Sequence, residues 1–169
     1  EIETEGRYPA RLALEWRFVP AEGAPIAGRL SANGGLDALE VRAEVDAPYA
    51  LSAELVVRDA LERPTVEGTV SGRIEPAAAG WETPVGAASA DVSLSGPFDE
   101  LAFDGRAAVV LPDIVELRVE TAGRWLGEAV ELDALELADA VSDARLSLSG
   151  RVDLAPQLDI RLSGAWRAV

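Results

Sequence analysis

The chain of 169 residues is long enough for one folded domain, and its 49% hydrophobic residues argue against intrinsic disorder. Its 15 basic and 30 acidic residues give a net charge of −15, which disfavours nucleic acid and anionic membrane surfaces as partners. The sequence has no Cys and no His, which removes disulfides, thiolate chemistry, and the commonest general base and metal ligand.

A strand pattern begins at Arg11–Val19, where the large apolar residues Leu12, Leu14, Trp16 and Phe18 alternate with charged or small ones. A period of two predicts a strand with one apolar and one polar face. We therefore predict an all-β fold. The same alternation recurs in Ile26–Ala32, Leu39–Val45, Leu51–Val57, Val66–Ile74, Ala90–Phe98, Leu101–Val109, Val115–Thr121, Ala144–Leu154 and Leu158–Ala168.

Turn residues separate most of these segments. Asn33-Gly34-Gly35 predicts the turn of a β-hairpin, and Asp104-Gly105 is the sharpest two-residue hairpin signal in the chain. The Ala-, Gly- and Pro-rich stretch Pro76–Ser89, which contains Trp81, predicts a loop that could cap one end.

The segment Gly127–Ser142 fits two structures. Val130, Leu132, Leu135 and Leu137 suit a strand with a break, whereas a stripe of Val130, Ala134, Leu137 and Val141 suits a helix. We favour the strand because the neighbouring segments are strands, and sequential strands usually pair.

The sequence repeats one short phrase. It reads Val-Ser-Leu-Ser-Gly-Pro-Phe from Val92, Leu-Ser-Leu-Ser-Gly-Arg-Val from Leu146 and Ile-Arg-Leu-Ser-Gly-Ala-Trp from Ile160, with a shorter copy at Val70. Such repetition of small β units predicts an elongated array whose strands contact mainly their neighbours. The absence of Met, even at position 1, suggests that this array is a fragment of a larger chain.

Five glycines fall in the phase of the inward-facing apolar residues. One interpretation is that each Ser-Gly starts a turn and that the shared phase is accidental. The other is a row of missing side chains, a crease along which the sheet folds over. These glycines are Gly28, Gly72, Gly96, Gly150 and Gly164.

A sheet of ten or eleven strands would be roughly 50 Å long, and twisted sheets of that size curl or split. If the two halves closed to the spacing of about 10 Å found between packed sheets, they would form an ordinary sandwich. If they stay wider apart, an apolar trough remains. We expect the trough, a long curved antiparallel sheet folded over along its length with an open groove and an apolar interior.

Nothing in the sequence predicts catalysis, a cofactor or a metal. No nucleotide-binding glycine motif, no nucleophile elbow and no calcium-loop spacing is present, and we predict that the protein is not an enzyme. No apolar run is long enough for a transmembrane helix. The carboxylates in the strands fall in the outward phase, where a solvated face explains them: Glu40, Glu44, Asp46, Asp91, Asp153 and Asp159.

With its repeated L-x-L-x-G phrase and long alternating strands, the chain resembles the β-repeat region of the TamB family, to which AsmA-type proteins are related. The resemblance covers Gly28–Val45, Val66–Ile74, Val92–Val109 and Ala144–Trp166. It implies an envelope protein anchored in the inner membrane that crosses the periplasm and carries phospholipid in an apolar groove, or supports outer-membrane assembly. It further implies an outer-membrane barrel partner of the TamA type, reached through the parent chain.

We therefore predict that residues 1–169 are a single β-repeat domain that binds or conducts phospholipid acyl chains. The alternative is a structural or adhesive β-sandwich with a closed core, which binds protein through its edges or outer face. The residues expected to line the groove are Leu12, Leu14, Trp16, Phe18, Val41, Val92, Leu94, Phe98, Phe103, Leu117, Val119, Leu146, Leu148, Val152, Ile160, Leu162 and Trp166.

Overall fold

The computed structural model describes residues 10–19, 25–46, 49–77, 85–111, 114–142, 144–155 and 157–168. They form a single antiparallel sheet of eleven strands, and the order of the strands in the sheet is their order in the sequence. The strands are β1 (Ala10–Phe18), β2 (Ile26–Gly34), β3 (Ala38–Val45), β4 (Leu51–Arg58), β5 (Thr65–Ile74), β6 (Ala88–Pro97), β7 (Leu101–Leu111), β8 (Ile114–Trp125), β9 (Ala129–Asp139), β10 (Arg145–Asp153) and β11 (Asp159–Arg167).

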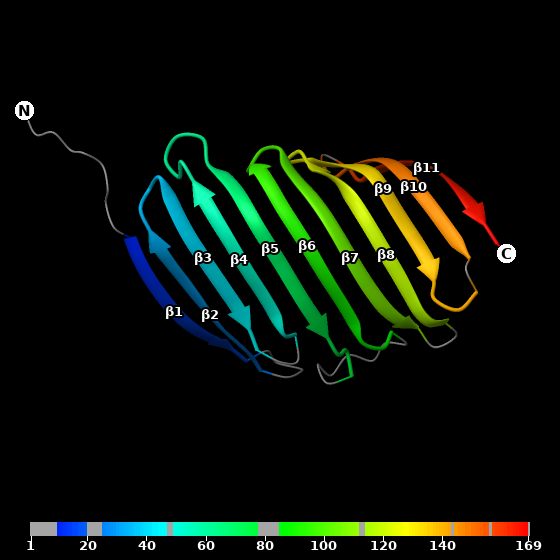
Figure 1. Cartoon of the computed structure of the whole chain (residues 1–169), viewed down its shortest axis with the longest axis horizontal. Helices are drawn as coiled ribbons and strands as arrows, with labels where there is room; N and C mark the ends of the chain where they lie inside the picture. The colour runs from blue at the N-terminus through cyan, green and yellow to red at the C-terminus, as the bar shows by residue number, and fades with distance from the viewer. Residues whose placement is uncertain are drawn as a thin grey trace, which may run out of the picture.

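The sheet is a long curved band that does not close into a barrel (Figure 1). The first strand and the last lie at opposite ends of the long axis, and the extensive contacts between strands all join sequential neighbours. No helix occurs among the described residues. The predicted all-β fold of one long curved sheet is therefore confirmed.

The pairing register keeps most large apolar residues of the strands in phase, although Val56 of β4 pairs with Glu40 and Glu67 on the opposite side. A register row is the set of residues joined by successive cross-strand pairs. One such row crosses all eleven strands without a polar side chain: Trp16, Gly28, Val45, Leu51, Gly72, Ala90, Ala107, Val119, Leu137, Leu146 and Trp166.

The ambiguous segment 127–142 forms β9, and its predicted break is a β-bulge. Ala122 pairs with Ala134, whereas the next residue of β8, Gly123, pairs with Leu132, so Asp133 is an extra residue in β9. The bulge moves the apolar phase from even numbers before it to odd numbers after it. This shift explains why the sequence fits neither a regular strand nor a clean helical stripe.

The hairpin predicted at Asp104-Gly105 is wrong. Both residues lie within β7, where Asp104 pairs with Ser93 of β6 and Gly105 pairs with Val92. The alternation of Leu101, Phe103 and Ala107 continues through the glycine, and this pattern prevails over the dipeptide signal. The chain turns earlier, after β6, where the Glu100 amide donates a 3.0 Å hydrogen bond to the Pro97 carbonyl oxygen.

The hairpin between β2 and β3 is confirmed, but its turn lies later than predicted. Asn33 and Gly34 still belong to β2, and the Gly35 amide donates a 3.0 Å hydrogen bond to the Ala38 carbonyl oxygen. In the predicted loop 76–89, residues 78–84 and therefore Trp81 lie outside the described residues. Its last two residues, Ala88 and Ser89, already belong to β6.

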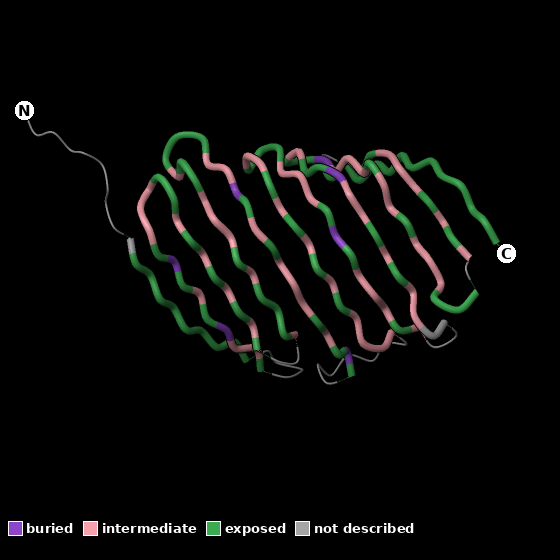
Figure 2. The backbone as a smooth tube through the Cα atoms, in the orientation of Figure 1, coloured by how far each residue is buried: buried purple, intermediate pink, exposed green. Residues whose placement is uncertain are grey.

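The fold has very little core. Among the described residues the buried apolar side chains are those of Ala32, Val66 and Ala129, with exposed fractions of 8%, 4% and 3%, and that of Pro76. The accessible surface of the chain is 11765 Å², against about 8,000 Å² expected for a compact protein of its mass. Figure 2 shows that most positions are half-buried or exposed, with residues 11–18 of β1 and all of β11 exposed. The alternative of a sandwich with a closed core is thus not what the described residues form.

Candidate functional site: an open apolar face

One side of the sheet, here called the apolar face, collects the residues that the register keeps in phase. It comprises the even-numbered residues of β1 from Leu12 onward and of β2, β5, β6, β10 and β11. The odd-numbered residues of β3, β4, β7 up to Val109 and β8 from Leu117 onward also belong to it. In β9 the bulge divides the contributing residues into Val130 and Leu132 before it, and Leu135 and Leu137 after it.

The apolar face carries no charge. Thr121 is the only residue with a polar side chain among those just defined. Asp139, the last residue of β9, pairs with Leu117 and marks the place where the face becomes polar at its rim. The protein has 30 acidic residues, yet none of them lies among the residues that define this face. Large contiguous apolar patches are rare on protein surfaces and usually mark a binding site.

The apolar face is open to solvent, and most so at the two ends of the sheet. Leu12 of β1 is 52% exposed and Trp166 of β11 is 65% exposed. In the central strands the same face is half-buried, as at Val70 and Val92, because each side chain is flanked by neighbours on two strands. Within the described ranges no second layer covers either region, so a ligand can contact the apolar face there without displacing any of these residues.

A shallow hollow of about 260 Å³ lies on the central part of this face, over β4 to β7. Its sides are formed by the larger residues Leu51, Val70, Ile74, Val92 and Val109. Between them stand residues with small or no side chains, which leave room above the backbone: Gly72, Ala88, Ala90 and Ala107. Ser71, Arg73 and Ser89 also border the hollow, but they have the outer-face phase of their strands, so the lining from the apolar face itself is aliphatic and suits an apolar chain.

The glycines of the apolar face make space for large neighbours. A Cβ added to Gly28 would lie 2.7 Å from the Trp16 ring, and one added to Gly123 would lie 2.9 Å from the Phe103 ring. In the same way, the end of the Leu148 side chain occupies the space above Gly164. Large side chains can therefore lie flat over cross-strand glycines, which keeps the face low and smooth.

The prediction that the five in-phase glycines share one face is confirmed, but the single row expected of them is wrong. Gly28 and Gly72 lie in the register row that joins Trp16 to Trp166. Gly164, Gly150 and Gly96 lie in the next three register rows, one row each. The phase of a residue can be counted along its own strand, whereas its row depends on the turn lengths and bulges of every preceding hairpin.

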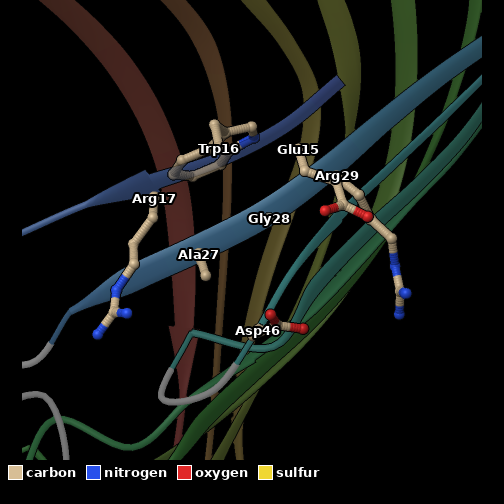
Figure 3. Close-up of a pocket in the computed structure, with 7 residues that line it drawn as sticks. All are labelled: Glu15, Trp16, Arg17, Ala27, Gly28, Arg29 and Asp46. Carbon is tan, nitrogen blue, oxygen red and sulfur yellow. The ribbon is translucent and has the colours of Figure 1, made fainter. Parts of the chain in front are cut away.

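The opposite side of the sheet, here called the outer face, is polar and pairs its charges internally. Figure 3 shows a hollow at β1 and β2 where the Trp16 ring lies on one side of the sheet and Arg17, Arg29 and Asp46 lie on the other. Arg29 donates a 2.6 Å hydrogen bond to Glu44 of β3. This bond and the charge of Glu44 raise the pKa of Arg29.

At the C-terminal end, a ladder of alternating charges crosses the outer face. It links the β6–β7 turn to β8, β9, β10 and β11 through six contacts of 2.6 to 3.3 Å. Each inner member contacts two oppositely charged neighbours. The ladder consists of Glu100, Arg124, Glu131, Arg151, Asp153, Arg161 and Asp159.

The outward carboxylates predicted from the sequence serve this outer face. Glu44 and Asp153 form ion pairs with arginines, and the described residues include no group of three or more acidic side chains placed to hold a metal ion. The described part of the chain also contains no helix suited to crossing a membrane.

The register places all but one of the predicted groove-lining residues on the apolar face. The exception is Phe98, which lies in the turn one residue beyond β6, and its amide donates a 3.3 Å hydrogen bond to the Pro64 carbonyl oxygen. Sequence reasoning also omitted many residues of the central strands that show the same period-two pattern. They include Leu30, Val45, Leu51, Leu55, Val66, Val70, Val109, Trp125, Leu132, Leu135 and Leu137.

Comparison with known proteins yields no relative: no protein-family model matches the chain, and neither a curated protein nor a solved structure matches it.

Proposed function

We propose that this protein binds lipid acyl chains on its apolar face and conducts them along the sheet. The observation that carries the proposal is an uncharged apolar face that continues across eleven strands and that nothing in the described structure covers. A surface of that kind is stabilised by any ligand that removes it from water. The Thr121 hydroxyl is the one polar side chain among the residues defined as this face, so little on it restricts the ligand to one orientation.

The energetics favour binding that is reversible. Burying one methylene group from water is worth about 0.8 kcal/mol, and an open face can cover only part of each one. Immobilising the ligand costs at least about 4 kcal/mol, so a single acyl chain needs about ten half-covered methylenes before it binds at all. Affinity then grows with the length of chain in contact, without any specific pocket.

The similarity of successive strands favours movement of a bound acyl chain along the sheet. Adjacent strands present similar mixtures of aliphatic side chains, alanine and glycine on this face, so neighbouring positions along the sheet differ little in binding energy. A ligand on such a surface meets no deep minimum. With eleven strands at a spacing of about 4.8 Å, the track is roughly 50 Å long.

The charged outer face supports the same proposal, because it gives a largely apolar sheet a water-compatible side. Its arginines and carboxylates pair with one another, and the surplus of acidic residues keeps copies of the protein apart in solution. The polar headgroup of a bound lipid would remain in solvent beyond the rim.

We further propose that the chain is a segment of a longer periplasmic protein, anchored in the inner membrane, that moves phospholipid between the two membranes or supports outer-membrane assembly. The support is the resemblance to TamB-type β-repeats, together with a long curved sheet open along one face. An outer-membrane barrel of the TamA type is the partner that this proposal names.

The proposal is tested with a matched pair of variants on β10. Leu148→Asp puts a charge on the apolar face, and Ser149→Asp puts the same charge on the outer face beside Arg151. We expect the first to weaken binding of a fluorescent phospholipid to delipidated protein at least tenfold and the second to leave it unchanged. Both variants are expected to keep a β circular-dichroism spectrum. Equal binding by both variants would contradict the proposal, as would unfolding caused by Leu148→Asp alone, the behaviour of a closed core.

A further inference from the structure

The hollow on the central part of the apolar face is longer in one direction than in the other. Its floor is formed by Gly72 of β5, Ala90 of β6 and Ala107 of β7, which are direct cross-strand partners in one register row. In the strands on either side, the same row holds the larger residues Leu51 and Val119. The floor therefore leads from β5 to β7, across the strands and not along any one of them.

Larger side chains stand on both sides of this floor. Val70 and Val92 lie in the next register row on one side, and Ile74 and Val109 lie in the next row on the other. Register rows of one face are two residues apart, so each row is about 7 Å wide. That width suits one hydrocarbon chain in van der Waals contact with the side chains beside it, and it is too narrow for two chains side by side.

The two possible directions of a bound chain differ in the contacts they make. A chain that lies across the strands can contact a larger side chain in every strand it crosses while it rests on the floor. A chain that lies along β5 would have to rise from Gly72 over Val70 or Ile74, each only two residues away. Lying across the strands therefore removes more apolar surface from water.

We propose that the hollow holds a single acyl chain that lies across β5, β6 and β7, with Ala90 and Ala107 beneath it. This inference rests on the proposed lipid binding and adds to it the direction of the bound chain. A chain in this direction points from strand to neighbouring strand, which is the direction in which the sheet is long (Figure 1). It can then move lengthwise along the sheet instead of sideways over the larger side chains.

The first test fills the floor with apolar side chains. Ala90→Leu and Ala107→Leu add apolar surface to the face, so a face without a preferred direction would bind a fluorescent phospholipid as tightly as before or more tightly. We expect both variants to bind it at least threefold more weakly, because the added side chain occupies the place of the acyl chain. The control Ala108→Leu adds the same side chain to the outer face of β7 and is expected to leave binding unchanged.

The second test locates the chain on the wild-type protein and needs no variant to fold. A phospholipid with a photoreactive diazirine in its acyl chain is crosslinked to delipidated protein, and the crosslinked residues are identified by mass spectrometry. We expect crosslinks on the floor and the flanking side chains of β5, β6 and β7, within the same three register rows. Crosslinks spread along one strand, for example from Val66 to Ile74 of β5, would overturn the inference.

The outcomes separate this inference from the proposed function. Undiminished binding by folded Ala90→Leu and Ala107→Leu proteins would also overturn the inference, and it would leave lipid binding by the apolar face in place. A wild-type protein that neither binds nor crosslinks phospholipid would overturn both.

Discussion

The two faces of the sheet are built on the same backbone but find their partners in different places. On the outer face, arginines and carboxylates from neighbouring strands contact one another, as Arg151 does with Glu131 and Asp153. On the apolar face, side chains contact cross-strand neighbours and then meet solvent. Side chains on the outer face therefore find charged partners within the same chain. Side chains on the apolar face stay exposed to water unless a ligand covers them.

A second contrast, within the apolar face, separates its centre from its ends. Val66 in β5 is 4% exposed, whereas Leu12 in β1 remains half-exposed. Val66 has strands on both sides, and Leu12 belongs to an edge strand. Burial in this fold comes from lateral neighbours alone, so the stability of a position depends on its distance from the two edges.

The largest expected effect is on a glycine of the apolar face. Gly150 has a φ of +147°, and a Cβ added there would collide with the Arg161 carbonyl oxygen of β11. We expect Gly150→Ala to lower the free energy of unfolding by about 3 kcal/mol, measured by urea denaturation.

The matched control is Gly127, in the turn before β9, where φ is +76° and no atom lies within 4 Å of an added Cβ. Gly127→Ala introduces backbone strain without a steric clash, and we expect it to lower the free energy of unfolding by about 1 kcal/mol. Equal losses in the two variants would show that close strand contact does not explain the glycine at position 150.

The centre and the end of the apolar face are compared by truncation. Val66→Ala removes two methyl groups from the most buried valine described, and we expect it to lower the free energy of unfolding by about 2 kcal/mol. Leu12→Ala removes half-exposed groups and is expected to cost about 0.5 to 1 kcal/mol despite the larger side chain. If Leu12→Ala proved the more destabilising, a covering layer over β1 would be required.

The outer face is tested at the arginine in the middle of the charge ladder. Arg151→Ala removes the contacts to Glu131 and Asp153, and we expect only a small decrease in the free energy of unfolding because solvent screens exposed ion pairs. Repeating the thermal melt in 1 M NaCl should bring wild type and variant together, since salt screens exposed ion pairs. A difference that persists in high salt would mean that Arg151 stabilises the sheet through packing.

The smallest effect is expected at the rim. Asp139 accepts hydrogen bonds from the Ser142 hydroxyl and from the Val141 amide, and these lower the pKa of its carboxyl group. The stabilisation is present above the ordinary pKa of about 3.9 and is lost as pH falls through the lower folded-state value. We expect Ser142→Ala to raise the pKa of Asp139 in an NMR titration. An unchanged pKa would assign the shift to the Val141 amide.

Most of the fold could be predicted from the sequence because its signal is local. Alternation located the strands, and the switch from Val130 and Leu132 to Leu135 and Leu137 indicated the break that the bulge produces. The same alternation outweighs the Asp104-Gly105 dipeptide, which could have been recognised as strand from Leu101, Phe103 and Ala107 around it.

The features that could not be predicted depend on how the strands are placed relative to one another. The rows of the five glycines depend on every turn length before them, and neither the openness of the sheet nor the exposure of β1 is encoded in any single strand. Phe98 illustrates the limit on the site itself: its phase matches that of Leu94, but the strand ends one residue earlier.

The central claim, that the apolar face is completed by lipid, is tested most directly by extracting protein purified without detergent and identifying the extract by mass spectrometry. We predict that phospholipid accompanies the wild-type and Ser149→Asp proteins in reproducible amounts and falls at least several-fold in Leu148→Asp. Folded wild-type protein that repeatedly carries no lipid, and takes up none from vesicles, would contradict the claim.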